Sequence, residues 1–185
     1  MPLAEITARS HDVVVDLAYA TPRNFTGKPI YVRPLCYLHP DALLRLENAI
    51  GLARALQLRL KIFDAFRPSE AQWVLWNHTP DPNFLADPRR GSPHSRGVAI
   101  DLTLVAGNGE ELDMGTGFDE FSPRSHHAST AIPPEAQRNR FLLLGLMSAA
   151  GWDFYRNEWW HYQLFDARRY PVLSDVDAPE RMMAS

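Results

Sequence analysis

Two short stretches of the sequence carry residues whose types and spacing fit metal chemistry. SPHSRGVAID (92–101) contains His94 and Asp101, and EWWH (158–161) contains Glu158 and His161. Two imidazoles and one carboxylate are the ligand set of a catalytic zinc site, in which the fourth position is left open for water. A second carboxylate that is not a ligand can then act as general base on that water. The two stretches therefore predict one zinc ion per chain.

The spacing of these residues requires irregular backbone at two places. On one straight strand, His94 and Asp101 would point to opposite faces because they are seven residues apart. A bend at Ser95-Arg96-Gly97, with a positive φ at Gly97, would bring them together. The same argument places Glu158 in a turn or bulge around Arg156-Asn157 and His161 inside the following strand.

The elements that must position these residues are visible as periodic segments. Helical spacing predicts helices over 39–57, 68–76 and 133–151. Strands are predicted over 60–66 and 98–104, and a hairpin over 152–155 and 160–165. Loops rich in Pro and Gly separate them at 78–92 and 106–132, and the tail after Pro171 is expected to be peripheral. Because helices and strands mix without a βαβ rhythm, we expect an α+β fold with a small central antiparallel sheet and flanking helices.

Length, composition and charge restrict the class of protein. The 185 residues predict a single domain, 1–185. The net charge is −3 and no Lys/Arg-rich run occurs, so nucleic acid is not an expected partner. The single cysteine, Cys36, fits a reducing compartment. With neither a signal peptide nor a long apolar stretch, we expect a cytoplasmic protein without a membrane partner. A homo-oligomer is left open.

The same residue types also fit roles without a metal. A buried Asp101 needs a cation or several donors, and Arg96 or Arg67 could supply them instead of a metal. His126-His127, in a loop with several glycines, is expected to be solvated. Cys36 lies in an apolar context with no activating group nearby, so it is expected to be a buried small hydrophobe.

Beyond these residues, most of the chain resembles the D-alanyl-D-alanine dipeptidases, a family of zinc peptidases. The stretches that carry the resemblance are DLAYATPRNFTGKPIY (16–31), FDAFRPSEAQ (63–72), SPHSRGVAIDLTL (92–104), MGTGFDEFSPRSHH (114–127) and NEWWHYQL (157–164). The H-x6-D and E-x-x-H patterns are shared with a wider group that includes D-Ala-D-Ala carboxypeptidases, phage endolysins and the hedgehog signalling domain. The resemblance therefore implies a hedgehog-like and DD-peptidase-like zinc scaffold.

The resemblance also implies roles for the catalytic residues. His94, Asp101 and His161 would bind the zinc ion. Glu158 would be the general base and then the proton donor to the leaving amine, and Arg67 would stabilise the tetrahedral oxyanion. A salt bridge from Arg67 to a neighbouring acidic residue, Asp64 or Glu70, is a second interpretation that can hold at the same time.

For the substrate, the resemblance implies a second set of residues. Ser92, Tyr19 and Asp119 match positions that hold its free amino end. Asp64 and Ser69 flank Arg67 and would orient it.

Three functions compete. The first is hydrolysis of free D-Ala-D-Ala to two D-Ala by a zinc dipeptidase, which would act on the supply of cell-wall precursor. The second is a zinc D,D-carboxypeptidase or endopeptidase that cuts peptidoglycan stem peptides. The third is a non-catalytic, zinc-stabilised binding domain. Glu158 together with Arg67 favours the enzymes, because a structural zinc site needs neither residue.

Overall fold

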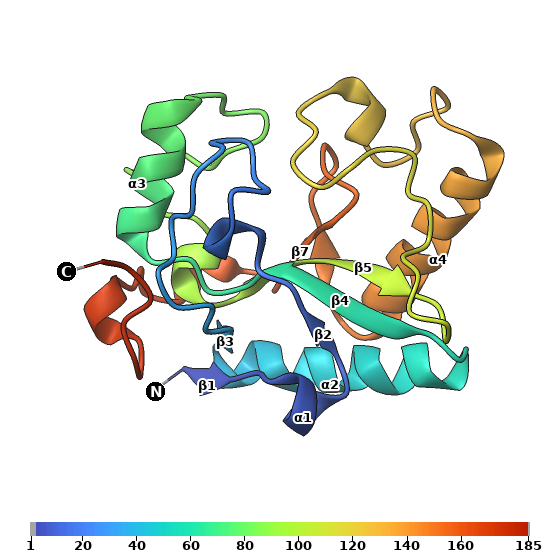
Figure 1. The fold of residues 1–185 in the computed structure, drawn as a ribbon, viewed down its shortest axis with the longest axis horizontal. Coiled ribbons are helices and arrows are strands. Elements are labelled where there is room, and N and C mark those ends of the chain that lie inside the picture. The colour runs from blue at the N-terminus through green and yellow to red at the C-terminus, as the bar shows by residue number, and fades with distance from the viewer. Residues whose placement is uncertain (1–2, 185) are drawn as a thin grey trace.

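A computed structural model describes residues 3–184 and shows a five-stranded sheet at the centre of an α+β fold (Figure 1). The strand order of this sheet is β2 (Val14–Val15), β4 (Arg59–Asp64), β5 (Ala99–Val105), β7 (His161–Gln163) and β6 (Asp153–Phe154). A separate two-stranded sheet pairs β1 (Ala4–Glu5) with β3 (Tyr37–Leu38). The predicted fold class is therefore confirmed.

The central sheet is mixed rather than wholly antiparallel. β5 pairs antiparallel with β4 and β7, and β7 pairs antiparallel with β6, which confirms the predicted hairpin. The edge strand β2 instead runs parallel to β4, so the expectation of an antiparallel sheet was wrong at this edge. A parallel pair needs a long crossover, and the chain between β2 and β4, which includes a 16-residue helix, supplies it.

The predicted helices are present with slightly shifted ends, and one short helix was not predicted. Within residues 3–184, the four α-helices are α1 (Ala8–His11), α2 (Pro40–Ala55), α3 (Ser69–His78) and α4 (Pro134–Ala149). The His39 side chain caps α2 by accepting a hydrogen bond from the Asp41 amide, and Pro40 occupies the first turn. Five short 3₁₀ helices lie in the loops: η1 (Ala18–Ala20), η2 (His94–Arg96), η3 (Pro123–Ser125), η4 (Ala167–Arg169) and η5 (Asp175–Asp177).

Two apolar clusters stabilise the molecule. The larger one joins the sheet to the buried faces of α2 and α4, and the smaller one gathers aromatic residues such as Tyr19 and Phe66. Met182 belongs to the smaller cluster and is 1% exposed, so the tail after Pro171 is not peripheral as expected. The backbone holds it there, because the Leu173 amide donates to the Ser95 carbonyl over 2.7 Å.

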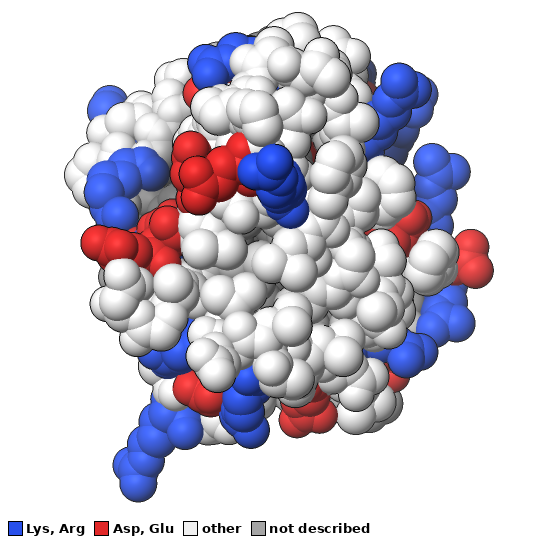
Figure 2. Space-filling view, turned by 90° about the vertical axis from the view of Figure 1, so that its right-hand side faces the viewer, with Lys and Arg blue, Asp and Glu red and all other residues white. Residues whose placement is uncertain are grey.

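The face that carries α4 shows charged side chains of both signs around a broad region without them (Figure 2). The charges on this face do not gather into one basic patch. Among the helices of residues 3–184, none is both long and apolar enough to cross a membrane.

Candidate active site

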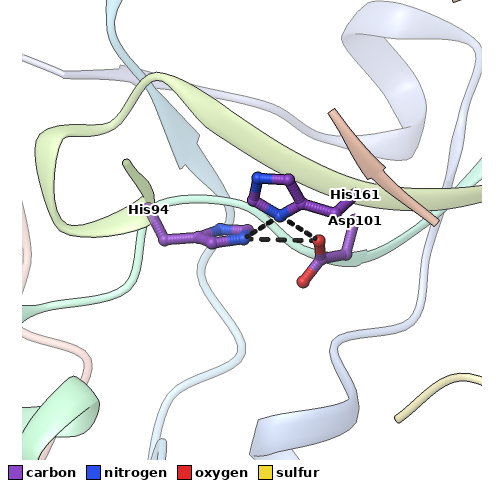
Figure 3. A group of neighbouring side chains, drawn as sticks. All are labelled: His94, Asp101 and His161. Carbon is purple, nitrogen blue, oxygen red and sulfur yellow. Dashed lines mark hydrogen bonds and ion pairs between the residues drawn. The ribbon is translucent and has the colours of Figure 1, made fainter. Parts of the chain in front are cut away.

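His94, Asp101 and His161 converge at the centre of the sheet, although they come from three separate segments (Figure 3). The His94 Nε2 atom lies 3.1 Å from His161 Nδ1 and 3.3 Å from Asp101 Oδ1. Asp101 Oδ1 lies 3.1 Å from His161 Nδ1. Ligand atoms about 2.0 to 2.1 Å from a tetrahedral zinc ion are about 3.3 Å apart, so this triangle fits such an ion. All three residues are buried.

Local backbone geometry turns His94 toward Asp101 as the spacing predicted. His94 opens the 3₁₀ helix η2, and Gly97 ends it in the left-handed region with φ of 67°. A Cβ atom at Gly97 would lie 2.7 Å from the Leu3 side chain and 3.2 Å from the His39 amide nitrogen. Only glycine fits this bend without strain, and the chain leaves it directly into β5.

Hydrogen bonds away from the triangle orient both imidazoles. His94 Nδ1 lies 2.7 Å from the Ala65 carbonyl oxygen, and His161 Nε2 lies 3.1 Å from Gln163 Oε1. Each of these oxygens accepts from the imidazole nitrogen that faces it, which leaves the other nitrogen with a free lone pair for a metal. Gln163 was not predicted from the sequence, and the only available signal was its place two residues after His161.

Strand pairing aligns the acidic residues with His161. Asp101 pairs with His161 on β7 and with Asp64 on β4. The register of β4 shifts between Ile62 and Asp64, so Asp64 does not follow the alternation of the strand. This bulge brings Asp64 to the same side of the sheet as Asp101.

Glu158 lies beside the triangle, in the turn before β7, as expected. Its Oε2 atom is 4.0 Å from His161 Nδ1, and its side chain is buried. Burial raises the pKa of the Glu158 carboxyl well above its usual range, and the nearby carboxylates of Asp101 and Asp119 raise it further. A carboxyl group in this position, beside the triangle and facing the cavity, can exchange a proton with a group held there.

The loop 106–132 fixes the turn that carries Glu158. The His127 amide donates to the Arg156 carbonyl over 2.9 Å, and the Trp159 amide donates to the Ser125 carbonyl over 3.1 Å. The His127 ring packs at the edge of Phe154, with ring centroids 5.0 Å apart. His127 therefore supports the turn from outside the triangle, and because its Nε2 atom is buried, the expectation that this residue is solvated was wrong.

Arg67 is buried and held from three sides. Its Nε donates to Asp64 Oδ2 over 2.8 Å, and its Nη1 donates to Gln72 Oε1 over 2.9 Å. Its Cζ lies 4.9 Å from the centre of the Tyr19 ring. The predicted salt bridge with Asp64 is present, so Asp64 orients Arg67 as expected. The Nη2 atom makes a longer contact of 3.5 Å with Asp101 Oδ2, so the pairing of Arg67 with Asp101 offered as an alternative to a metal is also present.

Ser69 acts differently from the expectation, and Gln72 was missed. The Ser69 hydroxyl donates to Glu70 Oε2 over 3.1 Å and makes no recorded contact with Arg67. Gln72, on the buried face of α3, holds Arg67 instead and donates to the Ala86 carbonyl over 2.8 Å. Gln72 lies one helical turn from Pro68, near the end of the strand that leads to Arg67. Ser69 lies at the first position of the helix, where its amide donates to the Leu173 carbonyl over 3.1 Å.

Two of the three residues expected at the amino end of a substrate, Tyr19 and Asp119, are in contact, and the third, Ser92, contacts His94. The Tyr19 hydroxyl donates to Asp119 Oδ1 over 3.2 Å, while Asp119 Oδ2 is enclosed and has no hydrogen-bond partner among residues 3–184. Asp119 lies in the left-handed region with φ of 59°, which aspartate tolerates better than most residues. The buried Ser92 hydroxyl accepts from the His94 amide over 3.2 Å, so it also supports the segment that carries His94.

A cavity of about 410 Å³ unites these groups. Its walls include the metal-ligating triangle, Glu158, Arg67, Ser92, Tyr19 and Asp119, with aromatic and proline side chains from the loop 78–92. At its inner end, the buried carboxyl groups of Asp101, Asp119 and Glu158 lie with one buried guanidinium, that of Arg67. Buried charge of one sign is costly, so the site is suited to receive cations.

Two residues weighed at the start are placed elsewhere. Arg96 donates to the carbonyl oxygens of Tyr170 and Arg90, so it does not pair with Asp101. Cys36 is buried, and burial raises the pKa of its thiol, which makes it unreactive as a nucleophile.

Comparison with known proteins decides the family. A family model of the M15 peptidases, described as D-ala-D-ala dipeptidase, matches residues 1–178. The chain belongs to this family. It is therefore a peptidase, and the resemblance predicted from the sequence is confirmed.

Curated relatives agree over most of their length. The D-alanyl-D-alanine dipeptidase of Escherichia coli (strain K12) is 46% identical over 173 residues, which cover 94% of this chain and 90% of the relative. That of Enterococcus faecalis (strain ATCC 700802 / V583) is 36% identical over 177 residues, covering 84% and 88%. Among solved structures, the Serratia marcescens L-Ala D-Glu endopeptidase ChiX aligns with a TM-score of 0.44 and 11% identity, over 88% of this chain and 98% of that chain. This last likeness is too distant to inform function.

Proposed function

We propose that the chain is a single zinc dipeptidase domain that hydrolyses free D-Ala-D-Ala to two D-Ala. The observation that carries the proposal is the convergence of a metal-ligating triangle, Glu158 and Arg67 on one cavity. Family membership and the names of the relatives support the same substrate. A structural metal site would need neither the carboxyl nor the guanidinium.

The donor set favours zinc as the metal. Two neutral imidazole nitrogens and one carboxylate oxygen are typical of catalytic zinc, whereas magnesium and calcium prefer oxygen ligands. His94, Asp101 and His161 would hold the ion, and Ala65 and Gln163 would hold the two imidazoles. When bound, zinc would supply Lewis acidity, which can lower the pKa of a water ligand to about 7.

The protein side chains around the metal can carry the proton transfers. Glu158 would accept a proton from the attacking water as the water oxygen bonds to the peptide carbon. The Arg67 guanidinium would stabilise the negative charge that develops on the carbonyl oxygen. When the C–N bond breaks, Glu158 would return its proton to the leaving amine, which regenerates the carboxylate and releases two amino acids.

The amino end of the substrate would be held by Asp119. Its Oδ2 atom is enclosed and without a recorded partner, while Tyr19 fixes Oδ1. An ammonium group would satisfy this oxygen, whereas an acylated nitrogen would leave the carboxylate desolvated and unpaired. We therefore expect the enzyme to act on free dipeptides and to reject longer stem peptides. Ser92, in the same wall, would help to shape this end of the cavity.

An amine-release assay tests the substrate. It compares D-Ala-D-Ala with L-Ala-L-Ala, N-acetyl-D-Ala-D-Ala and a stem pentapeptide. We expect the free D,D-dipeptide to exceed the acetylated one in kcat/KM by roughly 10² or more, because an unpaired buried charge costs several kcal/mol. Equal hydrolysis of both would favour a carboxypeptidase, and hydrolysis of none would favour a binding domain.

Metal analysis tests the ligand assignment separately. Asp101→Ala and His161→Ala should lose most of their bound zinc, whereas Glu158→Ala should retain it because Glu158 is not a ligand. Full zinc occupancy in both ligand variants would overturn the assignment. Loss of zinc from Glu158→Ala would make Glu158 a fourth ligand.

We also propose that the enzyme works in the cytoplasm on the supply of cell-wall precursor. The single Cys36 is a free thiol, as is usual in a reducing compartment. Measurement of the D-Ala-D-Ala pool in cells that express the wild type or Glu158→Ala would test this role. An unchanged pool would argue against it.

A further inference from the structure

A second cavity adjoins the active-site cavity. It lies at the end of the active-site cavity that is away from Asp119. It measures about 880 Å³. The two cavities share Arg90, Arg168 and Gln163 among their wall residues, but Asp119 and Glu158 line only the first. The shared residues mark the junction, so the two arginines border the active site where the second cavity meets it.

The guanidinium groups of Arg90 and Arg168 are free. Within residues 3–184, no hydrogen bond or ion pair is recorded for either group. Their neighbours are engaged: Arg89 pairs with Asp87 at 2.6 Å, and Arg169 donates to the Tyr170 hydroxyl over 2.7 Å. Two unpaired cations at the edge of a substrate cavity are suited to receive an anionic group.

Arg96 fixes the two segments that carry these arginines. Its guanidinium donates to the carbonyl oxygen of Arg90, over 3.1 Å, and to that of Tyr170, two residues after Arg168. Gly91 permits this approach, because a Cβ atom there would lie 2.8 Å from Arg96 Nη2. The loop 79–91 and the 3₁₀ helix η4 are therefore tied together at the backbone, although they are far apart in the sequence.

The substrate proposed above is a zwitterion, with an ammonium at one end and a carboxylate at the other. If Asp119 binds the ammonium and the peptide carbon lies at the metal triangle, the carboxylate points away from Asp119. It must lose water on entry, and cations or hydrogen-bond donors must replace that water. Guanidinium groups suit this task because they can donate two parallel hydrogen bonds to one carboxylate.

We propose that Arg90 and Arg168 bind the C-terminal carboxylate of the dipeptide. The inference rests on the proposed function and adds the direction in which the substrate crosses the site. The acidic end of the cavity takes the amino group, and the basic end takes the carboxylate. A C-terminal carboxamide, which has no charge, would lose this interaction.

The test combines arginine variants with a neutral substrate. Arg90→Ala and Arg168→Ala are compared with the matched controls Arg89→Ala and Arg169→Ala, which remove the same charge one residue away. Each protein is assayed on D-Ala-D-Ala and on D-Ala-D-Ala amide. We expect each cavity variant to raise KM for the free dipeptide about tenfold with little change in kcat, since a charged hydrogen bond contributes about 1.5 kcal/mol or more. Its kinetics on the amide should stay within about twofold of wild type.

Calorimetric titration of the zinc-loaded Glu158→Gln protein with both compounds separates this inference from the proposed function. Because the Glu158→Gln protein should bind the dipeptide without hydrolysing it, the difference between the two compounds measures the contribution of the carboxylate to binding. We expect the two arginine substitutions to weaken binding of the free dipeptide and not of the amide. Equal weakening for both compounds, or none for either, would overturn the role of the arginines. Absence of D-Ala-D-Ala hydrolysis by the wild type would overturn the proposed function instead.

Discussion

The two faces of strand β5 differ in what they contribute, although both are buried. Asp101 points to the metal triangle, whereas its neighbours Ile100 and Leu102 belong to the large apolar cluster. All seven residues of the strand are buried. Because side chains alternate along a strand, one step in sequence separates a residue needed for chemistry from one needed for stability. Substitutions at neighbouring positions should therefore fail in different ways.

The adjacent strands keep the same division. Tyr162 on β7 pairs with Ile100 and lies in the apolar cluster, while His161 pairs with Asp101 and lies at the site. On β4, Ile62 pairs with Leu102, and the bulge that follows directs Asp64 to the site. The bulge allows one strand to supply apolar contacts along most of its length and a carboxylate at its end.

The largest expected effect is a loss of turnover from a substitution beside the face of the sheet that carries Asp101 and His161. Glu158→Gln should lower kcat by about 10² to 10⁴, because the amide cannot accept the proton of the attacking water. The melting temperature should not fall, because the substitution removes a carboxyl whose pKa is raised by burial and by neighbouring carboxylates. Steady-state kinetics, zinc content and thermal melting check this. Glu47→Gln on the exposed side of α2 is the control and should change none of them.

A wild-type kcat in Glu158→Gln would remove Glu158 from the mechanism. A loss of zinc together with a lower melting temperature would instead show that its carboxylate holds the site together. These two outcomes distinguish a catalytic failure from a structural one.

A substitution on the opposite, apolar face of β5 should lower the stability of the protein and leave its chemistry intact. Leu102→Ala removes a fully buried side chain from the apolar cluster and should lower the free energy of unfolding by about 2 to 5 kcal/mol. At low temperature, the folded variant should keep its zinc and a kcat close to that of wild type. Chemical denaturation and metal analysis check this result against Asp101→Ala, which should lose zinc.

Thr103→Val serves as a matched control on the same strand. The Thr103 hydroxyl is buried without a recorded partner, so its removal should leave stability unchanged or slightly higher. If Leu102→Ala were as stable as Thr103→Val, the division of β5 into two faces would not describe its energetics.

The sequence predicted the site better than it predicted the sheet. His94, Asp101, Glu158 and His161 could be found because their residue types and short spacings are typical of the chemistry itself. The bend at Gly97 was predicted because residues seven apart, such as His94 and Asp101, point to opposite faces of a straight strand. The structure confirms the bend, with φ of 67° at Gly97. Local geometry was therefore accessible from local sequence.

Features that depend on distant contacts were not accessible. β2 has two residues and pairs parallel to β4, which no local pattern indicates. The bulge before Asp64 interrupts an alternation that would otherwise have placed this residue with Ile62. Met182 is buried only because the tail packs against the smaller apolar cluster. In each case the deciding partner lies elsewhere in the chain.

A smaller effect is expected at Gln72, which positions Arg67. Gln72→Leu removes the acceptor of the Arg67 Nη1 hydrogen bond. If Arg67 acts on the developing oxyanion as proposed, this variant should lower kcat about tenfold with a smaller change in KM. Gln72→Glu keeps an oxygen acceptor and should restore part of the rate. A purely structural role would instead lower the melting temperature of both variants without this difference in kcat.

The smallest effect compares one tyrosine near each face of the sheet. The Tyr155 hydroxyl donates to the Asn83 carbonyl over 2.9 Å and so ties the loop 78–92, which forms part of the cavity wall, to the turn that carries Glu158. Tyr155→Phe should raise KM a few-fold and speed tryptic cleavage after Arg89 or Arg90. The contribution of this hydrogen bond to the stability of the loop should be about 1 kcal/mol, because Asn157 also donates to the Asn83 carbonyl and remains in the variant.

Tyr162→Phe is the counterpart on the apolar face. Its hydroxyl is buried and has no recorded partner, so its removal should leave KM and proteolysis unchanged and should not lower stability. The same chemical change would then weaken the cavity wall on one side of the sheet and have no such effect on the other. If both variants loosened the loop equally, the hydroxyl of Tyr155 would not be what holds it, and the loop would depend on packing alone.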